Sequence, residues 1–203
     1  MDRSRAIIYK IMITLLLAER PGDLAAFNYK FLLRNGFSDW IDEIVVLIDS
    51  NLPTFENNRS KIKYVRREMN NGFVEHFNYG LDHCSNEWVY MLADDELPPP
   101  ALIVDGFELM HLARGHRAVA FPRANWFTWQ DRDKPILWPD MQTRLLRRGV
   151  RLAGDIHERV DVHADELLEL PSLPKYTINH MKTKQMQEAS ERLYSELKSH
   201  GRA

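Results

Sequence analysis

The sequence predicts an α/β domain with a mostly parallel central sheet and helices on both of its faces. Short runs of β-branched and other apolar residues alternate with segments whose apolar residues recur at helical spacing. The apolar runs are nearly continuous, which is typical of strands buried on both faces. With 203 residues the chain is long enough for a substantial core, and we expect a single domain over 1–203.

The first half of the chain predicts four strands and three helices. The strands are expected at 7–17, 41–48, 61–66 and 88–92, where the apolar runs lie. Helices are expected at 24–35, 73–84 and 101–114 from their helical spacing. Asp23 can cap the first of these helices, Gly36 can end it, and the prolines at 98–100 can open the last one.

The second half is less regular. Strands are expected at 118–122, 141–147, 154–162 and 176–180, an apolar segment lies at 167–173, and a C-terminal helix is expected at 183–200. The stretch 125–140 holds three tryptophans among turn residues, and we expect it to be irregular. Trp126, Trp129 and Trp138 either pack against a sugar acceptor or fill the core.

Composition narrows the class of protein. The net charge is -2 with a pI near 6.4, which gives no electrostatic basis for binding nucleic acid. The lone Cys84 cannot form an internal disulfide, so a reducing compartment is expected. The apolar run after residue 5 is interrupted by Lys10 and is too short to span a bilayer. We therefore expect a cytoplasmic protein without a transmembrane segment, peripheral to a membrane only through its acceptor.

Acidic residues follow two of the expected strands. Asp49 comes after the second strand, and Asp94, Asp95 and Glu96 come directly after the fourth. Ligands of open α/β sheets bind at the carboxyl ends of the strands. Mg²⁺ and Mn²⁺ prefer carboxylate oxygens and usually take phosphate oxygens as further ligands. The cluster therefore predicts either a metal that clamps a diphosphate or a cap for the helix opened at 98–100.

Several motifs of known enzyme classes are missing from the sequence, and an arginine-rich segment has two possible roles. His157-Glu158 is not followed by a histidine at the spacing of a zinc protease. The chain has no phosphate-binding GxxxxGK[ST] loop, no GxGxxG and no GxSxG elbow. Four arginines crowd one segment, and they form either a solvated strand edge or a counter-charge for a diphosphate: Arg144, Arg147, Arg148 and Arg151.

Three stretches, in the same order, resemble family 2 glycosyltransferases. They are 42–50, then 71–96 with Ala93-Asp94-Asp95-Glu96 at the place of the family's DxD motif, then 138–148 followed by His157-Glu158. The last stretch is similar to bacterial enzymes that build lipopolysaccharide cores and related glycans. With their connections they cover most of residues 7–182. The resemblance implies a GT-A fold and a hexosyltransferase-like enzyme.

The resemblance also implies a donor site. Asp49 would contact the nucleoside, and Glu19 would line the same pocket. Arg144, from the arginine-rich segment, is the residue of that segment that we expect to offer charge to the diphosphate. Asp95 would be the main ligand of Mn²⁺ or Mg²⁺, and His180 would complete the metal site. The family usually has Asp-Ala-Asp-Glu at this motif, so here the first acid, Asp94, is displaced by one position.

The same resemblance assigns the chemistry. Asp140 matches the general base of the family's xED motif, although Pro139 replaces the glutamate, and Glu158 is a reserve base. We expect an inverting, metal-dependent transfer from a nucleotide-diphosphate sugar, most simply a UDP-sugar, to a hydroxyl on a glycan, lipid or protein. The alternatives are a nucleotidyltransferase that makes nucleotide sugars and a non-catalytic glycan-binding module on the same fold.

Overall fold

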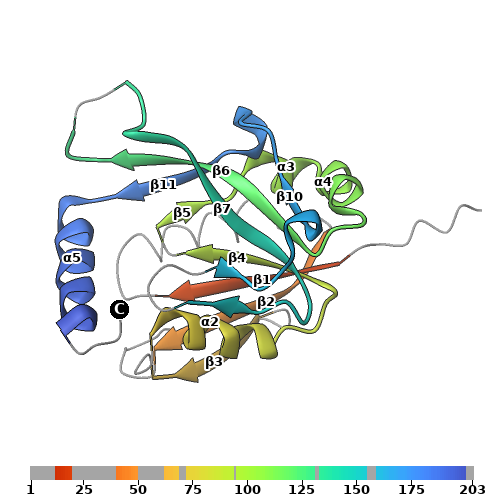
Figure 1. The fold of residues 1–203 in the computed structure, drawn as a ribbon, viewed down its shortest axis with the longest axis horizontal. Helices are drawn as coiled ribbons and strands as arrows, with labels where there is room; N and C mark the ends of the chain where they lie inside the picture. Colours follow the sequence, from red (N-terminus) through yellow and green to blue (C-terminus); the bar gives the residue numbers. More distant parts are fainter. Residues whose placement is uncertain are drawn as a thin grey trace, which may run out of the picture.

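The computed structural model of the chain describes residues 12–19, 40–49, 62–68, 72–93, 95–130, 133–154 and 159–199. Within them a nine-stranded mixed sheet forms the centre (Figure 1). Its strands are β1 (Ile13–Glu19), β2 (Ile41–Asp49), β3 (Ile62–Arg67), β4 (Trp88–Ala93), β5 (Glu96–Leu97), β6 (Ala118–Phe127), β7 (Leu137–Arg147), β10 (Leu167–Glu169) and β11 (Ile178–Lys182). A separate ribbon pairs β8 (Leu152–Ala153) with β9 (Arg159–Val160).

The strand order determines where a ligand can bind. Across the sheet the order is β3-β2-β1-β4-β7-β6-β11-β5, and β10 pairs with β6. β1 is parallel to β2 and β4, and β11 is parallel to β6. β7 runs antiparallel between β4 and β6. The carboxyl ends of β1, β2, β4, β6 and β11 therefore share one edge of the sheet with the start of β7.

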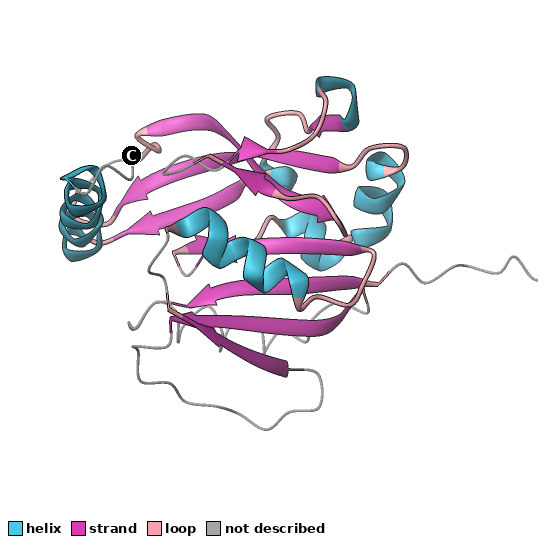
Figure 2. Cartoon of the chain, turned by 60° about the horizontal axis from the view of Figure 1, so that its bottom comes forward, coloured by secondary structure: helices cyan, strands magenta, loops and turns pink. Residues whose placement is uncertain are grey.

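Helices cover both faces of the sheet (Figure 2). The helices are α2 (Phe73–Asp82), α3 (Pro100–Val104), α4 (Gly106–Ala113) and α5 (Lys184–Ser199). Leu81 of α2 packs in the same core cluster as Leu16 of β1. Leu109 of α4 packs in the other cluster, with Leu15. Because successive strand residues point to opposite faces, one apolar strand supplies both cores. This two-faced burial confirms the α/β prediction.

The elements of the first half were predicted well where the structure describes them. The strands expected at 41–48, 61–66 and 88–92 and the helix at 73–84 are present with ends shifted by one or two residues. The first strand begins at Ile13 rather than residue 7, and residues 1–11 lie outside the described part. The helix expected at 24–35, with Asp23 and Gly36, also lies outside it.

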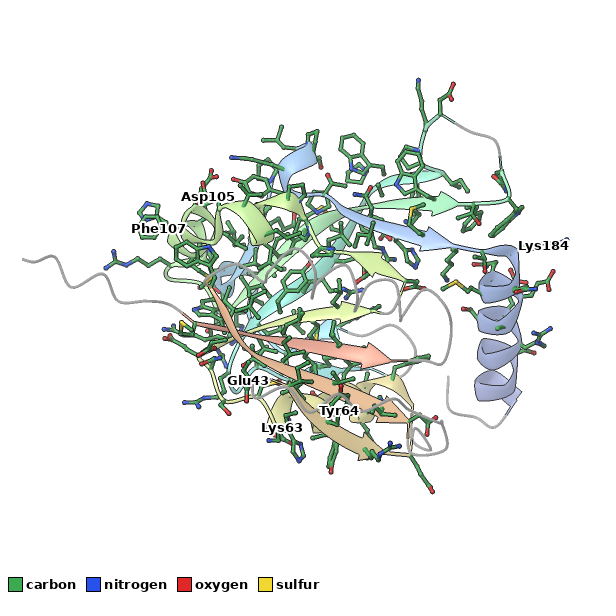
Figure 3. All side chains as sticks on the ribbon, turned by 180° about the vertical axis from the view of Figure 1, so that it is seen from behind. Glu43, Lys63, Tyr64, Asp105, Phe107 and Lys184 are labelled. Atoms are coloured by element: carbon green, nitrogen blue, oxygen red, sulfur yellow. The ribbon has the colours of Figure 1, made fainter. Side chains whose placement is uncertain are left out.

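The single helix expected at 101–114 is wrong, because the chain forms two helices there. Asp105 separates α3 from α4 with φ −139° and ψ 60°, which is not helical. Its side chain accepts a hydrogen bond from the backbone N–H of Glu108 at 3.1 Å and so caps α4 (Figure 3). An aspartate that caps a new helix satisfies a backbone donor that would otherwise be unpaired.

The expectation of an irregular stretch at 125–140 is also wrong. β6 continues to Phe127 and β7 begins at Leu137, so most of this stretch is a long β-hairpin. The strand expected at 154–162 is reduced to β9, with residues 155–158 outside the described part. The strand expected at 176–180 is β11, and the C-terminal helix is α5.

Candidate active site

A cavity of about 490 Å³ lies at the shared edge of the sheet. Its volume is within the range of sites that hold small ligands, about 300–1,000 Å³. Ala18, Asp49 and Ala93 line it from the ends of β1, β2 and β4. β7, β11, α2 and the β8–β9 ribbon supply further lining residues, and α5 supplies Ser190. The cavity is therefore where the rule for open α/β sheets places a ligand.

Asp95 and His180 meet at this cavity although they are far apart in the sequence. Both are almost buried, with exposed fractions of 4% and 7%. Nε2 of His180 lies 3.1 Å from Oδ2 of Asp95. The backbone N–H of Met181 donates to the carbonyl oxygen of Asp95 at 2.8 Å, which fixes β11 against this turn. The structure thus brings together the two residues expected to bind a metal.

The chemistry of this pair suits a divalent cation. Nδ1 of His180 lies 2.5 Å from Oδ1 of Asn125 and donates to it, so that Nε2 is the ring nitrogen that faces Asp95. A divalent cation bound between Nε2 and the Asp95 carboxylate would be coordinated by both groups. Adjacent ligands of Mg²⁺ or Mn²⁺, each about 2.1 Å from the ion, are about 3 Å apart. The observed separation fits this value.

Further ligands for such an ion would come from outside the pair. Among the residues that the structure describes, no group of three or more His, Cys, Asp or Glu side chains is arranged to hold a metal. Asp94, the displaced acid of the motif, lies outside them. Mg²⁺ typically takes one or two carboxylates, with phosphate oxygens and water completing the shell. A pair of protein ligands is therefore compatible with a metal that also binds a diphosphate.

Glu96 is the most deeply buried acid of the site, with an exposed fraction of 0%. Arg144 donates to it twice, from Nε at 3.0 Å and from Nη2 at 2.8 Å, and Arg123 donates from Nη1 at 3.0 Å. Burial alone would raise the pKa of Glu96, but the charge and hydrogen bonds of Arg144, and then the charge of Arg123, lower it to about 2. Arg144 lines the cavity as expected, but its guanidinium group is bound to this carboxylate.

Asp140 is joined to the same network. Its Oδ2 accepts from Arg123 at 2.6 and 3.0 Å and from Asn125 at 3.0 Å, and its Oδ1 accepts from Gln142 at 2.9 Å. Burial raises its pKa, but the hydrogen bonds of Asn125 and Arg123 outweigh this and lower the pKa below its usual value. Asp140 is therefore ionised and held in one orientation, next to the cavity-lining Gln142.

The opposite side of the cavity is more apolar. Phe73 and Phe77 of α2 line it together with Asp49, which ends β2, and His76. Asp49 is the last residue of β2 and Asp95 comes two residues after the end of β4, and these strands are separated only by β1. With neighbouring strands about 4.8 Å apart, the strand ends are about 10 Å apart. The cavity thus has an aromatic end and a charged end.

Three site residues of the sequence analysis cannot be placed fully. Asp94 and Glu158 lie outside the described residues. Glu19 is the last residue of β1, beside Ile48, and its side chain lies outside them. Sequence reasoning also missed Arg123 and Asn125, which bind Asp140. Their alternation just after the apolar start of β6 was a signal that a strand continues there with one polar face.

The tryptophans of the β6–β7 hairpin do not all fill the core. Trp129 and Trp138 have exposed fractions of 38% and 44%. Trp129 stacks on Phe127 with ring centroids 4.5 Å apart. Trp126 is half-buried and its Nε1–H donates to Asn179 at 3.1 Å. Core filling is therefore wrong for Trp129 and Trp138.

The fold and the cavity define an α/β domain of the GT-A type, and comparison with known proteins agrees. The family model described as "Glycosyl transferase family 2" matches residues 33–155, more than half of the chain. The chain belongs to glycosyl transferase family 2, as its sequence motifs suggested. Membership of this family does not favour the nucleotidyltransferase alternative.

Solved structures that are similar to the chain include two of S. aureus TarS. One matches with a TM-score of 0.52 at 12% identity, covering 92% of this chain and 39% of that chain. The other, TarS 1-349, matches with a TM-score of 0.48 at 11% identity, covering 82% of this chain and 60% of that chain. The chain therefore spans less than two thirds of either. No curated protein sequence matches it significantly. Among the helices described, none has the length and apolar character needed to cross a bilayer.

Proposed function

We propose that the chain is an inverting, metal-dependent glycosyltransferase that takes a sugar from a nucleotide-diphosphate donor. The observation that carries the proposal is the pairing of Asp95 with His180 at the charged end of a ligand-sized cavity. Family membership supports the reaction class. The proposed acceptor is a hydroxyl on a glycan, lipid or protein. A UDP-sugar is the first donor to test.

The charges around the cavity suit a diphosphate. Arg159 and Lys182 line it, with the two acids Asp49 and Asp95 among the described lining residues, while the charge of Arg144 is paired with Glu96. Cationic side chains bind phosphate oxygens through charge-assisted hydrogen bonds. Mn²⁺ or Mg²⁺ held by Asp95 and His180 would supply stabilisation of the negative charge that develops on the leaving diphosphate. The protein's own cations would hold the other phosphate oxygens.

Asp140 is the proposed general base. It would take the proton from the acceptor hydroxyl at Oδ1, which accepts from Gln142 alone in the hydrogen bonds described above, whereas Oδ2 accepts from both Arg123 and Asn125. The hydrogen bonds of its network hold the carboxylate in place and lower its pKa. The lowered pKa keeps Asp140 ionised and able to accept a proton, although it also makes Asp140 a weaker base. Glu158 remains the reserve candidate. One displacement with a single base at the acceptor oxygen inverts the anomeric carbon.

The exposed tryptophans support a site for a glycan, lipid-linked or protein acceptor. Trp129 and Trp138 offer aromatic faces at the hairpin, and such faces pack well against sugar rings. A reducing location such as the cytoplasm is part of the proposal, because the buried Cys84 is a free thiol. Contact with a membrane would come only through the acceptor.

Titration calorimetry with UDP tests the proposal against a non-catalytic module. We expect heat of binding that requires Mn²⁺ and that is lost in Asp95→Asn. The exposed Asp161→Asn, close in sequence to the cavity-lining Val160 and Val162, serves as the control and should bind normally. If no nucleoside diphosphate gives metal-dependent heat with the wild-type chain, the proposal is wrong.

A further inference from the structure

His76 is a buried residue with a ring nitrogen, Nδ1, that has no hydrogen-bond partner among the residues that the structure describes. It lies on α2 with an exposed fraction of 5%. Its Nδ1 makes no hydrogen bond in the described part of the chain. An unpaired buried polar group destabilises a protein, since it loses its hydrogen bonds to water without replacement. A ring nitrogen buried at such a cost is suited to a partner other than the described residues, such as a bound ligand.

The cavity is where that partner can bind. His76 lines the aromatic end together with Phe73, Phe77 and Asp49. Apolar walls with a few convergent polar groups are typical of sites for small organic ligands. Two aromatic side chains suit the flat face of a heterocycle. Asp49 and His76 then face the polar edge or the attached sugar of such a group.

The electrostatics of His76 indicate the kind of hydrogen bond it can make. Burial is the main cause that lowers its pKa, and the charge of Arg67 adds to this while that of Asp49 opposes it. The ring is therefore neutral at neutral pH, with one nitrogen that donates and one that accepts. Asp49, in contrast, is an acceptor when ionised. The two residues together can pair with both donors and acceptors of a ligand.

We propose that His76 is a specificity-determining residue that binds the nucleoside of the donor through a ring nitrogen. The inference rests on the proposed function, because it needs a nucleotide whose diphosphate occupies the charged end. It adds that the discrimination between nucleosides comes from the α2 end, by hydrogen bonds from His76. The diphosphate end contributes affinity without reading the base.

Calorimetry with four nucleoside diphosphates and with inorganic pyrophosphate tests the assignment, all in the presence of Mn²⁺. His76→Leu should weaken the tightest of ADP, CDP, GDP and UDP by about tenfold, the loss of one hydrogen bond. Its affinity for pyrophosphate should not change. His76→Asn keeps an amide near the position of Nδ1 and should recover part of the loss.

His116→Leu is the matched control. His116 also has a buried Nδ1 without a partner among the described residues, but it is not one of the residues that line the cavity. Its replacement should leave every affinity unchanged. Melting temperatures verify folding, and His76→Leu should melt at or above the wild-type temperature, because an apolar side chain removes an unpaired group.

The outcomes separate the inference from the proposal on which it rests. Unchanged nucleoside diphosphate binding in His76→Leu would overturn the role of His76 and leave the glycosyltransferase proposal intact. An equal loss of pyrophosphate binding would also overturn it, since that indicates damage to the whole site. Absence of metal-dependent binding of any nucleoside diphosphate to the wild-type chain would overturn both.

Discussion

At the scale of single residues, Glu96 links the cavity wall to the proposed base. Its carboxylate accepts from Arg123 and Arg144, and Arg123 also binds Asp140. A fully buried carboxylate is tolerated only when its charge is paired and its oxygens are hydrogen-bonded. Each of these residues therefore depends on the others for its position. Disturbing Glu96 should affect the base and the cavity wall together.

Replacing Glu96 tests this dependence. Glu96→Gln removes the counter-charge of Arg144 and one of the two counter-charges of Arg123, both largely buried, and we expect a loss of about 3–5 kcal/mol in the free energy of unfolding. Urea unfolding at pH 7 measures it. The control is Glu87→Gln, whose ion pair with Arg147 is about half exposed on both sides and should cost at most about 1 kcal/mol. Equal effects of the two substitutions would contradict the account.

The pKa of Glu96 predicts a pH dependence of stability. The folded value of about 2 is below the ordinary 4.5, so the unfolded chain binds the proton more tightly. The contribution of the ion pairs is complete above about pH 4.5 and is lost as the pH falls toward 2. Unfolding free energies measured across this window should fall more steeply for the wild-type chain than for Glu96→Gln. Parallel curves for the two proteins would be the contrary result.

Asp140→Asn addresses the chemical step. An asparagine is nearly isosteric but cannot accept the acceptor's proton, so we expect transfer to fall by about 10²- to 10⁴-fold while the Kd for the donor stays the same. Initial rates and calorimetry on the same preparation give the two quantities, with the melting temperature as a check of folding. Near-normal turnover would remove Asp140 as the base and direct attention to Glu158.

At the scale of elements, the position of α2 depends on a close approach to the sheet. A Cβ on Gly80 would lie 2.9 Å from Cδ1 of Leu16 and 3.0 Å from Cδ2 of Leu47, both fully buried. α2 also carries His76 and the two phenylalanines of the cavity. The small side chain at Gly80 thus determines how closely the aromatic end of the cavity approaches the strands.

Gly80→Ala should therefore destabilise the chain. Alanine favours a helix over glycine by about 1 kcal/mol, but overpacking a full core costs about 1–3 kcal/mol, so we expect a net loss. Gly80→Ser should lose more, because its side chain is larger. Urea unfolding midpoints give the order of the three proteins. A rise in stability for the alanine variant would show that the helix has room to move.

Much of the element pattern was readable from the sequence. β2 and β4 are buried on both faces, so their apolar runs identified them. The predictions of elements were wrong where the spacing of apolar residues did not determine the structure. Asp105 caps a second helix inside a stretch with continuous helical spacing. The end of β6 and the start of β7 contain polar residues that pair across the hairpin, such as Arg123 with Asp140, and periodicity of apolar residues does not detect such strands.

The site was predictable only in part, for a related reason. Asp49 and Asp95 follow apolar strands, so the rule for open sheets identified them. The partners of Asp140 and Glu96 come from β6 and β7 and are revealed only by their pairing across the sheet. Arg144 was expected to bind a diphosphate, yet its guanidinium is bound to Glu96. The buried, unpaired state of His76 depends on tertiary packing and has no signature in the sequence.

At the scale of the whole molecule, the sheet gathers a site from distant parts of the chain. β11 returns beside β6 and carries His180 to Asp95. In Figure 1 the strand ends of β1, β6 and β11 point toward α5, whose Ser190 lines the cavity. The central claim is that this gathered site binds a divalent ion and, through it, the diphosphate of a sugar nucleotide.

Anomalous diffraction from a crystal grown with Mn²⁺ and UDP tests this claim most directly. We expect one strong manganese peak within coordination distance of Asp95 and His180, bridged to the diphosphate, with the uracil between Phe73, Phe77 and His76. A bound nucleotide without a manganese peak at Asp95, or a peak elsewhere with the Asp95 and His180 side chains still paired to each other, would contradict the account.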